Sequence, residues 1–244
     1  KGFGKKSAEN FQKAAEFVLT SQKRMRLDIA EQLAASLVVL LEEALPKSHV
    51  VISGSLRRCL ETISNINLII LNATAKDVAK VLGPIVVINE VLESSLSASI
   101  EGREVCITIV DKENFCAVLA YGTGNYEYRQ MLLARASELG FEFSETGLQQ
   151  NGKVIETKTE EDFFKTLKLS YIEPESREEK NPKPVKGLLE LAGIHGLIHN
   201  HSTWSDAQNS IREMVQAARE RGYAYLAMAD HSRTSYYANG LSIE

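Results

Sequence analysis

The sequence predicts a mixed α/β (α+β) fold with a sheet domain near its beginning and further units behind it. Two observations predict this class. Apolar runs of strand length alternate with helical stripes between residues 27 and 110, and one of them, Val50–Ser53, runs into a Gly-Ser turn, an Arg pair and a second apolar run. The chain has 244 residues, 44% of them hydrophobic, which is enough for two or three domains.

Composition argues against several classes of protein. No apolar run approaches the roughly 18 residues that a membrane span needs, and no basic-apolar leader opens the sequence, so we expect a soluble, cytoplasmic protein. The three cysteines, Cys59, Cys106 and Cys116, are odd in number and lack C-x-x-C spacing. Neither a disulfide framework nor a zinc knuckle is therefore expected.

The first 26 residues are basic, although the whole chain has a net charge of -4. A glycine turn followed by lysines and an amphipathic run is typical of the second half of a helix-hairpin-helix. Its glycines allow the turn, its free amides can meet a backbone phosphate and its lysines add charge. We therefore predict that Gly2, Gly4, Lys5 and Lys6 contact the backbone of a nucleic acid. A glycine-rich helix start with solvated lysines is the alternative.

The sheet domain follows at residues 27–110. Apolar side chains at 27–45 form one helical stripe, which ends at Pro46. A strand then runs into Gly54, a short helix follows the turn, and another strand continues from Ile66. Beyond it we expect a helix at 76–82, a strand at 85–89, a Ser-rich segment at 93–99 and a strand at 104–110.

Residues 111–172 are predicted to form a second unit. A helix at 115–121 is broken at 122–124 and resumes at 126–139, with Gly140 as the C-cap. Short strands at 141–144, 147–149 and 154–156 and a helix at 160–168 complete the unit. The charged stretch that follows contains three prolines, and we predict a linker at 173–192.

Residues 193–244 contain an apolar strand, an amphipathic helix at 210–221 and a strand at 225–228. His199 and His201 are spaced i and i+2 at a strand end, so they face the same way. His231 follows the next parallel strand and reaches the same edge. Converging histidines of this kind indicate metal ligands, and a structural role for them is the alternative.

Several separate motifs, in one order, resemble the bacterial family X DNA polymerases, the small repair polymerases to which polymerase beta belongs. They are GFGKKSAEN, GSLRRCLETISNINLII, YGTGNYEYRQMLLARASELGFEFSETGL, YIEPESRE, HNHSTWSDAQNS and MADHS. The resemblance implies the end of the fingers at 1–26, the palm at 27–110 and the thumb at 111–172, arranged around a short gap in DNA. It also implies that 193–244 begin a polymerase-and-histidinol-phosphatase (PHP) β/α barrel with metal-dependent 3′–5′ nuclease activity.

The same resemblance assigns a nucleotide site. In the family, residues of one group of motif positions grip the triphosphate of the incoming nucleotide or adjoin its sugar. The residues of this sequence at those positions are Gly54, Ser55, Arg58, Tyr121 and Gly124. An aromatic residue of the family's motif is replaced by Gly122. A nucleoside triphosphate is thus a possible partner beside DNA.

The family's three metal-holding aspartates would fall at Asn65, Asn67 and Cys106. Asn65 and Asn67 alternate on a strand, so both side chains face one place. Amides and a thiol carry no charge, however, and Mg²⁺ is a hard cation that prefers carboxylate oxygen. We expect Mg²⁺ to bind poorly here and nucleotidyl transfer to be absent, because both the metal anchors and the base are lost.

In the PHP domain, the resemblance places metal ligands at His199, His201, Asp206 and His231, with Mn²⁺ or Zn²⁺ as the expected cation. Leu197 stands where the family has an aspartate. The other ligands and most of the barrel would follow Glu244, so we take the sequence as a fragment of a longer chain.

The predicted function is therefore that of a family X repair protein, nucleoid-associated in the cytoplasm. It would bind gapped or primer-end DNA through its helix-hairpin-helix, palm and thumb, with a degenerate palm and a PHP nuclease in the full-length chain. Three alternatives stay open. The protein could be a non-catalytic scaffold for DNA or a repair partner, a nucleotide sensor, or an active polymerase despite its substitutions.

Overall fold

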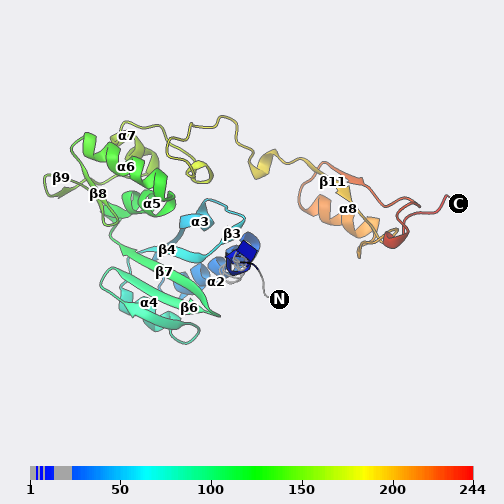
Figure 1. The fold of residues 1–244 in the computed structure, drawn as a ribbon, viewed down its shortest axis with the longest axis horizontal. Coiled ribbons are helices and arrows are strands. Elements are labelled where there is room, and N and C mark those ends of the chain that lie inside the picture. Colours follow the sequence, from blue (N-terminus) through cyan, green and yellow to red (C-terminus); the bar gives the residue numbers. More distant parts are fainter. Residues whose placement is uncertain (1–3, 5, 8, 14–23, 244) are drawn as a thin grey trace. The chain divides into compact units, whose positions relative to one another are not determined.

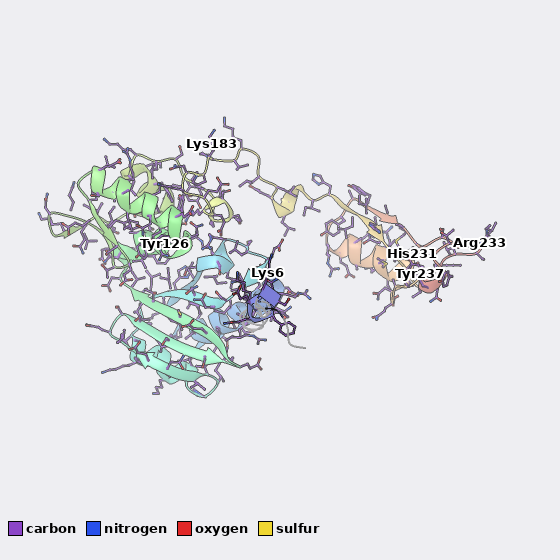
Figure 2. The ribbon with its side chains drawn as sticks, viewed as in Figure 1. Lys6, Tyr126, Lys183, His231, Arg233 and Tyr237 are labelled. Carbon is purple, nitrogen blue, oxygen red and sulfur yellow. The ribbon has the colours of Figure 1, made fainter. Side chains whose placement is uncertain are left out.

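The computed structural model describes residues 4, 6, 7, 9–13 and 24–243 (Figure 1). Contacts divide the chain into two compact units, Lys1–Val185 and Lys186–Glu244. Two predicted DNA contacts, Gly2 and Lys5, lie outside the described residues, and the other two, Gly4 and Lys6, are exposed. Figure 2 labels Lys6. The helix-hairpin-helix therefore stays a prediction. No helix among the described residues is long and apolar enough to cross a membrane.

The predicted palm, residues 27–110, is built on a five-stranded sheet with the order β2-β4-β7-β6-β5. Its strands are β2 (His49–Ser53), β4 (Asn65–Leu71), β5 (Val87–Val91), β6 (Ser95–Ile100) and β7 (Arg103–Val110). β4 and β7 run parallel, and the other neighbouring pairs are antiparallel. This mixed sheet, with helices on it, confirms the predicted α/β class.

Helices α2 (Leu27–Ala44) and α4 (Ala75–Leu82) cover one face of this sheet. Alternation along β4 sends Ile66, Leu68 and Ile70 into this core, where each is at most 1% exposed. The other face is covered only toward the end of β4, where Ile69 and Leu71 pack on helix α5. The beginning of β4, which carries the two asparagines, is left facing a cleft.

The Ser-rich segment at 93–99 contains strand β6, which the sequence pattern did not predict. Serine favours strands only weakly, but β6 pairs with β7 on one side and β5 on the other, and its Leu96 and Ala98 are buried. Tertiary pairing and burial thus override local propensity. A small ladder between β1 (Met25–Arg26) and β3 (Thr62–Ile63) was likewise not predicted.

The predicted thumb contains three helices and a small antiparallel sheet. Its elements are α5 (Phe115–Thr123), α6 (Tyr126–Glu138), β8 (Glu142–Ser144), β9 (Gly147–Gln150), β10 (Lys153–Val154) and α7 (Glu160–Thr166). α5 continues through Gly122 and ends before Gly124, so the predicted break begins too early. Gly140 follows α6 with a φ of +75°, as expected of a helix C-cap glycine.

Packing of the thumb extends beyond the residue at which a linker was predicted to begin. Pro174–Ser176 form a 3₁₀ turn, and Arg177 is fully buried. Its Nε donates to the carbonyl of Ile172 (2.9 Å) and its Nη1 to Glu160 (2.8 Å). A charged, proline-containing sequence resembles a linker, but a buried ionic partner for Arg177 holds this part of it in place.

The second unit is a single β-α-β unit. Strands β11 (Gly196–Asn200) and β12 (Tyr225–Met228) run parallel and are joined by α8 (Ile211–Glu220). A capping box between Ser210 and Glu213 begins the helix. The predicted strands and helix are confirmed, whereas a PHP barrel stays a prediction.

Candidate functional site

A polar cleft of about 850 Å³ opens between the palm sheet and the first two thumb helices. All the positions predicted to hold a nucleotide line it: Gly54, Ser55, Arg58, Tyr121 and Gly124. The cleft thus has the expected place and size for a nucleotide. What it can do depends on its charges.

The three positions at which the resemblance implies aspartates, Asn65, Asn67 and Cys106, come together beside this cleft. Asn67 lies opposite Cys106 in the parallel β4–β7 register. The Asn65 Nδ2 atom is 3.4 Å from Asn67 Oδ1 and 4.0 Å from Cys106 Sγ. Strand alternation therefore aims the three side chains at one another as expected, and none of them carries a negative charge.

A carboxylate that the sequence analysis missed adjoins this group. Glu104 lies opposite Asn65 in the register, two residues before Cys106 and hence on the same strand face. Burial raises the pKa of the Cys106 thiol, and Glu104 adds to this shift. The thiol therefore stays protonated near neutral pH and is a poor metal ligand, because the thiolate is the form that binds.

The turn that follows β2 requires a glycine for two reasons. Gly54 has a φ of +68°, in the left-handed region. A Cβ atom there would lie 2.5 Å from Asn67 Nδ2. The turn and the asparagine are thus in direct contact, which places the predicted phosphate-binding turn beside the substituted triad.

Arg58, the predicted triphosphate ligand, is already engaged inside the unit. Its guanidinium forms an ion pair with Glu178 and donates to the carbonyl of Thr123 (2.6 Å). The Nδ2 atom of Asn125 donates to the carbonyl of Glu178 at 2.6 Å and so fixes this residue beside the cleft. Only 9% of the Arg58 side chain is exposed. The carboxylate of Glu178 thus already binds the Arg58 guanidinium that a phosphate would need.

The neighbouring Arg57 ties the palm to the thumb through a buried network. It pairs with Glu160, which also accepts from the buried Arg177. Burial alone would raise the pKa of Glu160, but the hydrogen bonds and charges of both arginines outweigh it and lower this pKa below its ordinary value. Sequence patterns gave no sign of this network, which joins three distant segments.

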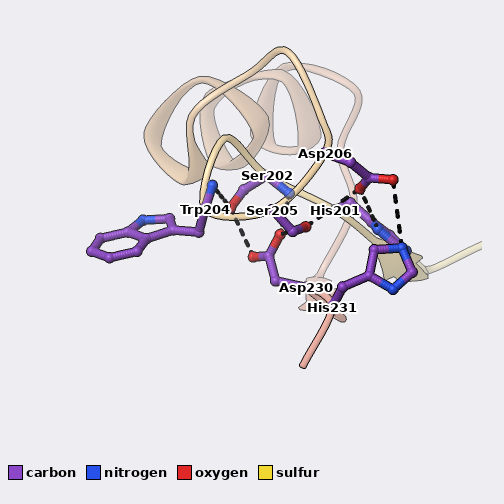
Figure 3. A network of polar contacts seen from close by, with 7 residues as sticks. All are labelled: His201, Ser202, Trp204, Ser205, Asp206, Asp230 and His231. Carbon is purple, nitrogen blue, oxygen red and sulfur yellow. Dashed lines mark hydrogen bonds and ion pairs between the residues drawn. The ribbon is translucent and has the colours of Figure 1, made fainter. Parts of the chain in front are cut away.

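A second candidate site lies in the β-α-β unit (Figure 3). His201 Nδ1 is 2.9 Å from Asp206 Oδ1, and His231 Nε2 is 3.5 Å from Asp206 Oδ2. One ligand atom from each residue lies within 4.8 Å of the others. Three of the four predicted metal ligands are therefore together. The fourth, His199, stacks its ring 5.4 Å from that of His201 but is not in the group.

The donor set of this cluster fits a borderline divalent cation. Two imidazole nitrogens and one carboxylate suit Zn²⁺ or Mn²⁺. A hydrogen bond with His201 lowers the pKa of Asp206, so the carboxylate is ionised. Among the residues that the structure describes, this is the one group of histidine, cysteine and acidic side chains close enough to hold a metal.

Asp230 fixes the loop that carries two of these ligands, a role that the sequence analysis missed. It accepts from the backbone N–H of Ser202 (2.6 Å) and from the hydroxyls of Ser202 and Ser205 (both 2.7 Å) (Figure 3). These bonds lower the pKa of Asp230, led by that from Ser205. The three hydrogen bonds that Asp230 accepts thus hold the loop 201–206 in position.

Comparisons with known proteins agree with this architecture. The family model of the DNA polymerase beta thumb matches residues 118–178. The chain is also 32% identical over 259 residues to the Bacillus subtilis protein named DNA polymerase/3′-5′ exonuclease PolX, with all of this chain covered. The chain belongs to the bacterial family X DNA polymerases.

Family X membership fits the observed thumb. The matched region ends at Glu178, the residue that pairs with Arg58, and so includes the buried Arg177. The chain covers 45% of the Bacillus subtilis protein, somewhat less than half of its length. The relative therefore supports the family and the fold of this chain. The activity of this chain has to be argued from its own residues.

Proposed function

We propose that this family X chain binds primer-end or gapped DNA and does not transfer nucleotides. The observation that carries the proposal is the convergence of Asn65, Asn67 and Cys106 at the edge of the cleft. A two-metal centre needs anionic oxygens at such a place to hold its cations and to take a proton from the primer hydroxyl. Two amides and a protonated thiol do neither.

The magnitude of the loss supports this conclusion. A unit charge pair 4 Å apart is worth about 4 kcal/mol at an effective dielectric constant of 20. A ligand with a Kd of 1 mM is bound by about 4.1 kcal/mol. The loss of even one carboxylate is thus comparable to the whole binding free energy of a cation with a Kd of 1 mM. Glu104 supplies a single carboxylate next to the group and does not replace the three that the resemblance implies.

Binding of DNA is supported by features other than the triad. The cleft keeps its glycine turn and its place beside the thumb, and Lys6 is exposed in the basic N-terminal segment. The Bacillus subtilis relative carries the name of a DNA polymerase. The palm and thumb would then position DNA, while the N-terminal segment adds contacts to the phosphate backbone.

The second unit supports a nuclease role for the full-length protein. His201, Asp206 and His231 would hold Mn²⁺ or Zn²⁺, which would supply an activated water for phosphodiester hydrolysis. Asp230 would keep the loop with two of the ligands in register. A single β-α-β unit supplies only part of such a centre, so the activity is proposed for the longer chain.

Nucleotide sensing is the second candidate function. The 850 Å³ cleft retains the predicted triphosphate residues, but Arg58 is paired with Glu178. A nucleotide would have to displace this carboxylate. Sensing thus predicts weak triphosphate binding without turnover.

The proposal is tested by fluorescence anisotropy with primer–template DNA and by digestion of 3′-labelled DNA with Mn²⁺, both with the full-length protein. We expect salt-sensitive binding, and digestion that disappears in the His201→Ala variant. Binding without digestion would leave a non-catalytic scaffold, and an absence of salt-sensitive binding would contradict the proposal.

A further inference from the structure

Two exposed tyrosines lie side by side on a short 3₁₀ helix in the second unit, Tyr236–Ala238. Tyr236 is 85% exposed and Tyr237 is 78% exposed. Their ring centroids are 5.9 Å apart, and the ring planes meet at 80°. Two adjacent aromatic rings give a larger exposed apolar surface than the single exposed residues that are common on proteins, and such a surface suits a flat aromatic ligand.

The backbone holds these tyrosines in place. The N–H of Leu241 donates to the carbonyl of His231 at 2.7 Å, which closes the loop behind them. Ala238, directly after the pair, is buried. The rings are therefore presented by a closed turn and not by a loose strand of chain, so less conformational entropy is lost when a ligand covers them.

The pair adjoins the histidine cluster. The Tyr237 ring centroid is 6.4 Å from that of His231, whose Nε2 faces Asp206. Figure 2 shows His231 and Tyr237 near one another, with Arg233 at the same end of the unit, and Arg233 is exposed. An aromatic face thus adjoins the metal-type donor set, and an exposed cation lies at the same end of the unit (Figure 2).

We propose that Tyr236 and Tyr237 form a stacking platform for the terminal base of a single-stranded 3′ end. Every base has a π-face, so aromatic stacking holds single strands with little sequence preference. Arg233 would contact the adjoining phosphate, and the 3′-terminal phosphodiester would lie against His201, Asp206 and His231. The inference rests on the proposed DNA-binding function and adds the feature that selects a frayed end over a paired one.

The test uses the full-length protein and an oligonucleotide with 2-aminopurine, whose fluorescence falls when it stacks. EDTA is present, so no DNA is cleaved. We expect quenching with the probe at the 3′ terminus and much less with the probe five nucleotides inward. The double variant Tyr236→Ala/Tyr237→Ala should lose the terminal quenching and bind about tenfold more weakly. Tyr236→Phe/Tyr237→Phe should keep both, because stacking needs the ring and not the hydroxyl.

Trp204 supplies a matched control. It is 66% exposed in the same unit, and Figure 3 shows its ring pointing away from the histidines. Trp204→Ala should leave the quenching unchanged. Equal quenching in the wild type and in the Tyr-to-Ala double variant, or equal loss in Trp204→Ala, would overturn the platform. Wild-type binding without terminal quenching would overturn the platform alone, whereas an absence of DNA binding would overturn the proposed function with it.

Discussion

Glu178 forms an ion pair with Arg58 at the edge of the palm cleft, across 120 positions of sequence. Glu178, the last residue that the thumb family model matches, thus holds the arginine that is predicted to grip a triphosphate. The Arg58 side chain is 9% exposed and that of Glu178 is 35% exposed, so the pair is partly shielded from water. Any anion that binds Arg58 has to compete with this carboxylate.

Removal of the competing charge should strengthen nucleotide binding. We expect Glu178→Gln to bind a nucleoside triphosphate about tenfold more tightly than the wild type, because phosphate then meets Arg58 without displacing an anion. Isothermal titration with a triphosphate in EDTA measures the change. Glu179→Gln is the matched control, since Glu179 is exposed and adjacent. Unchanged or weaker binding by Glu178→Gln would show that Arg58 does not contact the phosphates.

The uncharged triad should make DNA binding independent of divalent cations. Wild-type affinity for primer-end DNA is expected to differ by less than about twofold between EDTA and Ca²⁺, since there are no triad carboxylates to neutralise. The triple variant Asn65→Asp/Asn67→Asp/Cys106→Asp should bind about tenfold or more weakly in EDTA and recover with Ca²⁺, because three added charges repel phosphate. Anisotropy titrations measure both.

A matched charge control for this triple variant lies on the other side of the sheet. Gln32→Glu/Ala35→Glu/Val39→Glu adds three charges to exposed positions of α2, a helix that packs on the opposite face. This variant should show a much smaller loss in EDTA. A strict need for Ca²⁺ that persists in the His201→Ala variant would mean that the palm holds a cation after all.

The Arg57–Glu160–Arg177 network should stabilise the contact between palm and thumb. Glu160→Gln leaves Arg177, which is fully buried, without its countercharge, and a loss of about 3 kcal/mol in the free energy of unfolding is expected. Urea denaturation at pH 7, followed by circular dichroism, measures it. Glu161→Gln, at an exposed neighbouring position, should change the free energy of unfolding by less than about 0.5 kcal/mol.

The same network predicts a pH dependence. The pKa of Glu160 is lowered in the folded protein from an ordinary value of 4.5, so the unfolded chain binds this proton more readily. The stabilisation is present above about pH 4.5 and is lost as the pH falls through the lower folded-state pKa. Wild-type stability should therefore drop more steeply below pH 4.5 than that of Glu160→Gln. Parallel curves for the two proteins would contradict an ionised Glu160.

Lys6 should contribute one phosphate contact. Lys6→Glu is expected to weaken DNA binding similarly for all sequences and to reduce the slope of log K against log salt concentration by about 1. Lys47→Glu, at an exposed position after α2, is the control and should have a smaller effect. A slope that does not change would remove Lys6 from the interface.

What the sequence could predict followed from local periodicity. Alternation on β4 correctly brought Asn65 and Asn67 to one face. Cys106 was added to the group only by the family resemblance, and the parallel β4–β7 register brings it opposite Asn67. Helices with caps or prolines at their ends were likewise predictable, as α2 before Pro46 shows. These features depend on neighbours a few residues apart, which is the range that a pattern reports.

Apart from Glu104, which strand alternation with Cys106 could have indicated, the missed features depend on partners far apart in the chain. Arg57 meets Glu160 across 103 positions, and Asp230 meets Ser202 across 28. No local pattern gives such pairs, because either residue alone resembles an ordinary surface charge. The strand β6 was missed for the same reason, since its pairing with β5 and β7 outweighs the weak preference of serine for strands.

The most direct test of the central claim is single-turnover extension of a primer at a one-nucleotide gap, with protein in excess so that all the DNA is bound. We expect no extension by the wild type above a blank without protein, with either Mg²⁺ or Mn²⁺. Asn65→Asp/Asn67→Asp/Cys106→Asp should show measurable extension if the rest of the cleft is intact. Templated addition of the correct nucleotide by the wild-type protein would contradict the claim that its palm has lost catalysis.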